Sequence, residues 1–236
     1  MLPFISAFTC TYGRPIHMVN DVIECFLRQY YGGKKELVIL NDLKNQQLIF
    51  DHPDVRIINT NERILPLGSK FNAAVNECNG DIVMPWEDDD IFLPWRMSVS
   101  IDNMVDGWFH TGDAWWLYKY DKMKIVNNLF HSALAIEKND LVYRDTESCG
   151  LDQLLWEDLG SPKSMTIEHA DIFYIYRTHH DSYHASGYDR NTNASENAAR
   201  YVQKRMNYGK IRLGKVNLKP SWSRNWIEFV KAQGVI

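Results

Sequence analysis

The feature that most constrains this chain is a run of four acidic residues after a short apolar stretch. Residues 81–84 are apolar after Asp81 and partly β-branched, which predicts a buried strand; after Pro85 and Trp86 come Glu87, Asp88, Asp89 and Asp90. Adjacent carboxylates repel one another and raise one another's pKa values, so they need a cation or much water. Carboxylate oxygens suit Mg²⁺ or Mn²⁺, and ligands bind at the carboxyl ends of strands in open α/β sheets. The pattern therefore favours a metal site over a solvated acidic loop.

The first hundred residues have the periodicity of an α/β fold. Residues 3–11 predict a buried strand, residues 15–31 a helix that Gly32 and Gly33 stop, and residues 36–40 a second strand. Strand, helix and strand in this order predict a parallel unit with a right-handed crossover. A further strand at 55–59 and a helix at 68–78 then lead to the acidic cluster.

The second half is less regular. It predicts a helix after Pro94, two strands around a turn within 107–120, a strand over 127–136 and a late strand over 170–176. Residues 181–199 are polar and are expected to form a mobile loop that closes over a ligand. Apolar residues at helical spacing in 222–230 are expected to pack on the core, because few basic residues accompany them as membrane contact would require.

Composition narrows the classes of protein. The 236 residues are 45% hydrophobic and 24% charged, as in a globular protein, and the net charge of -4 argues against a dedicated nucleic-acid binder. Four scattered cysteines predict reduced thiols in a cytoplasmic protein. No signal peptide and no transmembrane segment are expected, since no apolar run approaches ~20 residues, although peripheral membrane contact stays open.

The acidic cluster carries a family resemblance. Residues 87–94, Glu-Asp-Asp-Asp-Ile-Phe-Leu-Pro, resemble the "DxD" region of family 2 glycosyltransferases with the GT-A fold, commonly Asp-Ser-Asp-Asp-x-x-x-Pro. The resemblance implies that Asp89 binds the metal and that Asp88 faces the ribose and donor sugar. Glu87 stands where the family usually has Asp, which leaves open which carboxylate makes which contact.

Two earlier strand ends extend the resemblance. Residues 8–15 are similar to the family's Thr-x-x-Tyr-Asn-Arg segment, and residues 37–42 to its Val-Asp-Asp segment, although Asn41 replaces the commoner Asp. In the family these ends hold the nucleobase, usually uracil, and a carboxylate suits the pyrimidine N3–H. Lys70 or Arg63 would meet the diphosphate. The nucleotide-binding candidates are Thr9, Tyr12, Arg14, Asp42, Lys70 and Asp88. The structural alternatives are that Thr9 is an ordinary strand residue, that Asp42 forms a turn, and that Lys70 is a solvated lysine.

A third similar segment supplies a catalytic candidate. Residues 149–156 resemble the family's Glu-Asp-x-x-Leu-Trp at the start of a helix, which makes Asp152 the general base, although Leu151 replaces the Glu. A carboxylate at a helix N-terminus is also an ordinary capping residue. Asp145 and Glu147 are the nearby substitutes.

The remaining site candidates concern the metal and the acceptor. Residues 176–179 resemble the family's Tyr-Arg-x-His, in which the histidine completes the metal shell; this implies His179, with His180 as its rival and a plain surface loop as the alternative. Trp115 and Trp116 could stack on a sugar, although only one of an adjacent strand pair faces outward. His131 lies in the segment that leads towards the family's acceptor site.

The resemblance, which covers about residues 3–186, implies one GT-A domain over residues 1–236. Its mostly parallel nucleotide-binding sheet is flanked by helices and merged with a smaller acceptor-binding part. About 1–100 would bind the nucleotide sugar and about 101–199 the acceptor; beyond the resemblance, the spacing of apolar residues predicts a helical tail over 200–236. The implied function is metal-dependent, inverting transfer of a sugar from a nucleotide sugar, such as a UDP-sugar, to a hydroxyl acceptor such as a glycan. The alternatives are a nucleotidyltransferase on a related sheet and a non-catalytic sugar-nucleotide or glycan-binding protein.

Overall fold

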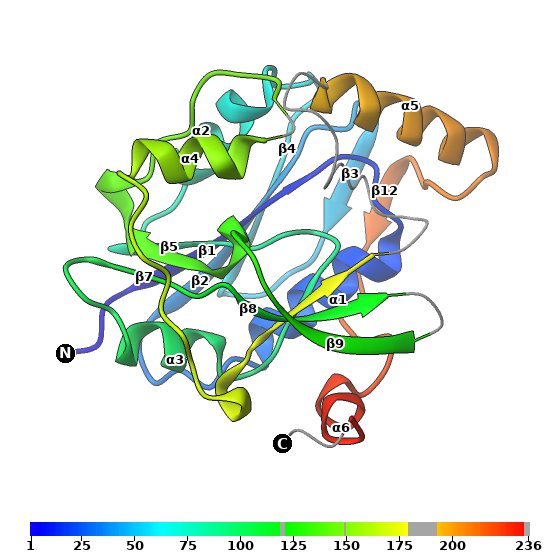
Figure 1. The fold of residues 1–236 in the computed structure, drawn as a ribbon. Coiled ribbons are helices and arrows are strands. Elements are labelled where there is room, and N and C mark those ends of the chain that lie inside the picture. Colours follow the sequence, from blue (N-terminus) through cyan, green and yellow to red (C-terminus); the bar gives the residue numbers. More distant parts are fainter. Residues whose placement is uncertain (119–120, 149, 179–192, 234–236) are drawn as a thin grey trace.

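A mostly parallel six-stranded sheet forms the centre of the structure, a computed structural model that describes residues 1–118, 121–148, 150–178 and 193–233 (Figure 1). The strand order is β4-β2-β1-β5-β10-β7. Strand β1 (Ile5–Thr11) pairs in parallel with β2 (Lys35–Asn41) and β5 (Ile82–Pro85), and β2 pairs in parallel with β4 (Val55–Asn59). The predicted parallel strand–helix–strand unit is confirmed, with α1 (Ile16–Leu27) as its crossover.

Alternation along the strands divides the core into two layers. Ile5 and Ala7 of β1 pack with Val22 of α1, whereas Phe8 packs on the other face of the sheet. That second face is covered by α2 (Leu67–Asn76) and α4 (Leu151–Asp158). Every residue from Leu37 to Leu40 is buried, as expected for a strand covered on both faces.

A second, four-stranded sheet includes the strand that directly follows the acidic cluster. Its order is β6-β11-β8-β9, from β6 (Ile91–Phe92), β11 (Tyr174–Arg177), β8 (Asp113–Tyr118) and β9 (Lys122–Asn127). Strand β6 follows the acidic cluster directly, and β11 pairs with it antiparallel. The second sheet therefore brings residues near 177 against the cluster. Helix α3 (Arg96–Asp102) leads from β6 of the second sheet to β7 (Trp108–His110), the edge strand of the central sheet.

The expected strand over 127–136 is wrong in part. Strand β9 ends at Asn127, a 3-10 turn follows at His131–Ala133, and a separate strand β10 (Leu134–Glu137) begins there. The reason is tertiary: β10 inserts antiparallel beside β5, with Ile136 opposite Val83, so the chain must leave one sheet and enter the other.

The C-terminal region contains more than the helices that the sequence predicts. The expected loop is wrong for residues 194–199, which begin α5 (Ala194–Asn207); the side chain of Asn193 caps this helix by accepting from Glu196 N at 2.8 Å. Strand β12 (Gly214–Asn217) pairs in parallel with β3 (Gln46–Ile49). Helix α6 (Trp226–Lys231) packs on the core through the buried Trp226 and Val230, as expected.

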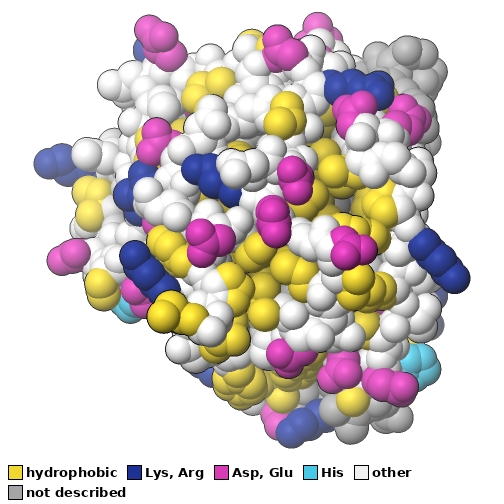
Figure 2. Space-filling model, turned by 90° about the vertical axis from the view of Figure 1, so that its left-hand side faces the viewer, with side chains coloured by type: hydrophobic (Ala, Val, Ile, Leu, Met, Phe, Trp, Pro, Cys, Tyr) yellow, Lys and Arg dark blue, Asp and Glu magenta, His cyan; other side chains and the backbone are white. Residues whose placement is uncertain are grey.

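The surface carries both charged and apolar side chains. Figure 2 shows the face on the left of Figure 1, where acidic side chains are scattered between apolar patches. Within the part of the chain that the structure describes, no helix is long and apolar enough to cross a membrane. Cys10, Cys25 and Cys78 are free thiols, as the scattered cysteines predict.

The glycine at the start of α2 tests the close packing above the sheet. A Cβ on Gly68 would overlap the carbonyl oxygen of Arg144, a backbone atom that cannot rotate away. Alanine normally favours a helix by ~1 kcal/mol over glycine. We expect the opposite sign at this position: Gly68→Ala should lower the free energy of unfolding by about 1–3 kcal/mol, measured by urea denaturation. Gly32→Ala, which meets only an ordinary contact, is the control, and equal stability of the two variants would contradict this packing.

Candidate functional site

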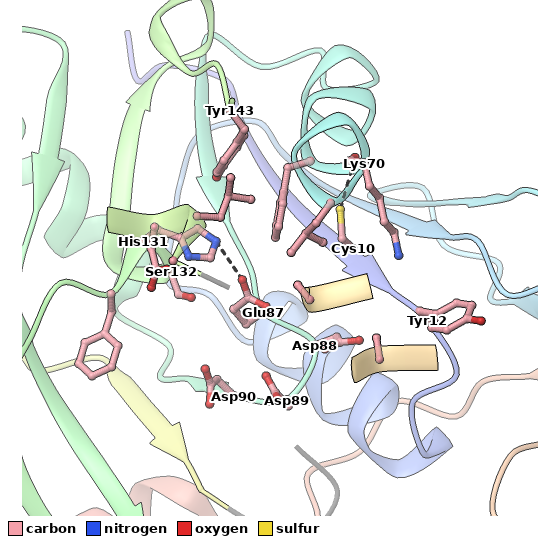
Figure 3. Close-up of a pocket in the computed structure, with 18 of the residues that line it drawn as sticks. Cys10, Tyr12, Lys70, Glu87, Asp88, Asp89, Asp90, His131, Ser132 and Tyr143 are labelled. Carbon is pink, nitrogen blue, oxygen red and sulfur yellow. Dashed lines mark hydrogen bonds and ion pairs between the residues drawn. The ribbon is translucent and has the colours of Figure 1, made fainter. Parts of the chain in front are cut away.

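A pocket of about 380 Å³ opens where β1 and β5 end, between the acidic cluster and the helices α2, α4 and α5 (Figure 3). This is the edge of a parallel sheet where ligands are expected, because the chain turns away from each strand there. Tyr12 after β1, Glu87 to Asp90 after β5 and Asp152 on α4 all line it. The fold therefore brings together residues that are far apart in the sequence.

The acidic cluster has a geometry that fits a metal ion. Glu87, Asp88 and Asp89 each offer an oxygen, and these atoms all lie within 4.8 Å of one another. The side of the loop nearest the sheet is fixed, because Trp86 N donates to Phe8 O and Thr9 Oγ1 donates to Trp86 O at 2.8 Å. Thr9, a predicted nucleotide contact, is thus buried behind the loop and does not line the pocket.

Arg14 is the counter-ion of the cluster. Its Nε lies 2.6 Å from Asp88 Oδ1, and its Nη2 lies 3.0 Å from Asp89 Oδ2. Asp88 and Asp89 are only 2% and 9% exposed. Burial, with the charges of Asp89 and Glu87, raises the pKa of Asp88 to about 6, although Arg14 opposes the shift. The cluster therefore carries buried negative charge that a bound divalent cation would offset.

Asp90 turns away from the other three carboxylates. It accepts from Tyr174 Oη at 2.5 Å and from Arg177 N at 2.8 Å, both on β11. Burial and the neighbouring Asp89 raise its pKa well above the usual range. Asp90 thus joins the loop to the second sheet, and it stands outside the group of three that could hold a metal.

Arg177 links the backbone of the acidic cluster to helix α1. Its Nε donates to Asp89 O at 2.5 Å, and its Nη1 lies 2.8 Å from Oδ2 of the fully buried Asp21 on α1. Asp21 in turn accepts from the backbone and the hydroxyl of Ser223 at 2.7 and 3.1 Å. In the sequence, Arg177 only marks the position of the histidine that follows it. Its ion pair with Asp21 has no local sequence signal, because 156 residues separate the two.

Another group of predicted residues lies just after the carboxyl ends of β1 and β2. Asp42 is fully buried; Lys70 Nζ lies 2.7 Å from its Oδ1, and Ile64 N donates to its Oδ2 at 3.1 Å. The guanidinium carbon of Arg63 lies 3.3 Å from the centroid of the Tyr12 ring. Lys70 therefore pairs with Asp42, and its Nζ lies 5.9 Å from the centroid of the Tyr12 ring, farther from the ring than Arg63.

The opposite wall combines His131, Tyr143 and Asp152 with Glu87. His131 Nε2 lies 2.9 Å from Glu87 Oε1, as the dashed line in Figure 3 shows. Burial alone would lower the pKa of His131, but Glu87, with a smaller contribution from Asp152, raises it. Asp152 stands in the first turn of α4 and lines the pocket, whereas Asp145 and Glu147 do not. No sequence signal singled out Tyr143 or the contact between Glu87 and His131.

The remaining predicted residues lie elsewhere. Trp115 is packed in the core, and Trp116 is half-buried, with its Nε1 donating to Thr178 Oγ1 at 2.6 Å and Lys124 Nζ 4.6 Å from its ring centroid. Neither tryptophan lines the pocket. Because Trp115 is buried, Trp116 is the only one of the two that can offer a ring face to an acceptor. His179 and His180 lie outside the described residues.

Comparison with known proteins identifies the fold. No family model matches the sequence, and no curated protein matches it. Among solved structures, the mannosyltransferase PcManGT from Pyrobaculum calidifontis, in complex with GDP-Man and Mn²⁺, is similar with a TM-score of 0.56 at 13% identity. That match covers 99% of this chain and 80% of the other.

TarS from S. aureus is also similar. Residues 1–349 of TarS match with a TM-score of 0.52 at 11% identity, over 87% of this chain and 72% of the other. The same part of TarS has been solved with UDP-GlcNAc; that structure matches with a TM-score of 0.52 at 10% identity, over 86% of this chain and 73% of the other. These likenesses confirm the predicted fold: the chain is an α/β protein of the GT-A type.

The three clustered carboxylates should bind a divalent cation. Mn²⁺ binding is expected to weaken at least about tenfold in Asp89→Asn, because one charged ligand is lost while Arg14 remains. Isothermal titration with Mn²⁺ measures the change. Asp140→Asn, an exposed carboxylate outside the pocket, is the matched control. Equal Mn²⁺ affinity in the two variants would contradict a metal site at Asp89.

Proposed function

We propose that this chain is a metal-dependent, inverting glycosyltransferase that moves a sugar from a nucleotide sugar to a hydroxyl group of an acceptor such as a glycan, with a UDP-sugar as donor. The observation that carries the proposal is that the three metal-competent carboxylates and Asp152 line a single pocket at the carboxyl edge of the sheet. The fold supports it, because the similar proteins were solved with GDP-Man and Mn²⁺ and with UDP-GlcNAc.

The acidic cluster is the proposed site of Mn²⁺ or Mg²⁺. Its three oxygens lie close together, they are hard ligands, and the raised pKa of Asp88 reflects buried charge that a cation would offset. A bound metal would act as a Lewis acid that neutralises the departing diphosphate. Arg14 holds Asp88 and Asp89 in place beside it, and Arg177 holds the loop backbone through Asp89 O.

Asp152 is the proposed general base. It would accept the proton of the acceptor hydroxyl while the oxygen of that hydroxyl forms a bond to the anomeric carbon. The bond from the anomeric carbon to the phosphate oxygen breaks, and the nucleoside diphosphate leaves with the electron pair. Because the attack is in line with the leaving group, the anomeric configuration inverts. A base on α4 suits this reaction, since Asp152 lines the same pocket as the acidic cluster but stands outside the three carboxylates that could hold the metal.

The donor is tested by thermal stabilisation. A ligand at a hundred times its dissociation constant stabilises by about 2.7 kcal/mol, which corresponds to roughly 5–10 °C in a chain of this size. We expect UDP and UDP-sugars to raise the melting temperature by this amount with Mn²⁺, and by much less with EDTA. GDP and GDP-sugars are the comparison. A larger shift with GDP would move the donor to that class, and no shift with any nucleotide would remove the proposal.

The mechanism is tested at Asp152. Loss of a general base typically costs ~10²–10⁴-fold in rate. Asp152→Asn should therefore keep UDP-sugar binding and lose that much turnover, whereas Asp145→Asn, whose side chain lies outside the pocket, should keep its activity. NMR of the product should show a configuration opposite to that of the donor. Retention, or a fully active Asp152→Asn, would overturn this mechanism, and release of pyrophosphate would indicate a nucleotidyltransferase.

A further inference from the structure

The charges of this acidic chain are unevenly distributed. Residues 197–227 contain eight of the 26 lysines and arginines and none of the 30 acidic residues. This segment therefore carries +8, whereas the rest of the chain, with 18 basic and 30 acidic residues, carries -12. Such an asymmetry indicates a partner of negative charge, because it places local attraction on a molecule that is acidic as a whole.

The structure places most of these basic residues at the surface of one region. Helix α5, the connection over 208–213 and strand β12 follow one another on the right of Figure 1. Ala198, Val202 and Arg205 are buried on the inner face of α5, so Arg200 and Lys204 project from the outer face. The basic surface, as we name it, consists of six exposed side chains: Arg200, Lys204, Lys210, Arg212, Lys215 and Lys219.

The charges of the basic surface are not used inside the protein. Among the described residues, none of the six forms an ion pair with a carboxylate. Arg224, the remaining partly exposed cation of the segment, is paired with Asp121 at 3.0 Å. Lys204 stands in the last turn of α5, where the helix dipole favours a cation, but this does not explain the lysines and arginines beyond the helix.

Apolar side chains are exposed among the cations. Tyr208 at the end of α5 is 70% exposed, and Leu213 before β12 is 42% exposed. Tyr201, on the flank of α5, is also exposed. Aromatic and aliphatic groups between lysines and arginines are the composition of surfaces that lie on anionic membranes, with the cations near the headgroups and the apolar groups inserted among them.

We propose that the basic surface docks this protein on a membrane that contains anionic phospholipids. A flat bilayer can contact α5 and the segment over 208–219, and acidic side chains more than about 8 Å from it are screened at physiological salt. An extended nucleic acid fits less well, because a strand continuing past the patch would meet the acidic remainder, and an aliphatic Leu213 offers it nothing. Helix α5 also lines the pocket through Ser195 and Asn197, so one helix joins the docking surface to the site.

The test uses the full chain and two vesicle types, phosphatidylcholine alone and phosphatidylcholine mixed with phosphatidylglycerol. We expect sedimentation with the mixed vesicles only, weakening as salt rises. Each neutralised lysine should lower the partition coefficient about fivefold. The triple variant Lys204→Gln, Lys210→Gln and Lys215→Gln should therefore bind about a hundredfold more weakly. The control Lys34→Gln, Lys122→Gln and Lys163→Gln makes the same change in net charge at exposed lysines elsewhere.

Two further measurements decide the nature of the partner. Tyr208→Ala with Leu213→Ala, which keeps all charges, should weaken vesicle binding as well, because apolar insertion is lost. Circular dichroism of each variant checks that the fold is kept. Equal binding by the two triple variants, or no binding to mixed vesicles, would overturn the proposal. Tighter, patch-dependent binding to single-stranded nucleic acid than to vesicles would replace it with that partner.

Discussion

Burial of consecutive carboxylates between two sheets is the constraint on which the site depends. Asp88, Asp89 and Asp90 are each at most 9% exposed, and such charge is costly unless cations and hydrogen-bond donors surround it. Arg14 supplies the charge on the pocket side, and Arg177 supplies donors to the backbone and to Asp90. Helix α1 serves both arginines, because Arg14 lies just before its first turn and Asp21 on its inner face holds Arg177.

This arrangement links the metal-competent loop to the far end of the chain. Asp21 is held by Ser223, and the neighbouring Trp222 donates to Cys25 Sγ on the same helix at 3.2 Å. The segment before α6 therefore restrains the aspartate that positions Arg177, which in turn positions Asp89. The C-terminal segment therefore supports the pocket through its hydrogen bonds to Asp21, without lining it. The placement of Asp88 and Asp89 thus depends on α1, on β11 and on the segment before α6, and of these the segment before α6 acts indirectly, through its hydrogen bonds to Asp21.

Features that depend on local patterns could be predicted from the sequence, and features that depend on long-range pairing could not. Buried strands, the crossover helix and the acidic turn show in apolar runs and in the residues that follow them. The short strands β3 and β12 lack an apolar run, since β3 is buried at alternate positions and β12 only at Val216, and they pair across more than 160 residues. Helix α5 was hidden by its polar composition, although Asn193 and Glu196 form a recognisable capping pair. His131 was placed near the acceptor, but its contact with Glu87 arises only because β10 inserts beside β5.

The charge distribution shows why net charge is a weak guide to partners. A value of -4 argues against anionic ligands only if the charges act together, but exposed charges farther apart than about 8–10 Å are largely screened at physiological salt. A ligand therefore senses the nearest side chains. At the acidic cluster these are the carboxylates of Glu87, Asp88 and Asp89 with Arg14, which favours a cation, and on α5 and the segment after it they are six cations without a carboxylate partner among the described residues, which favours an anionic surface. The two regions are joined by a single helix, so each can attract its own partner while the chain as a whole stays acidic.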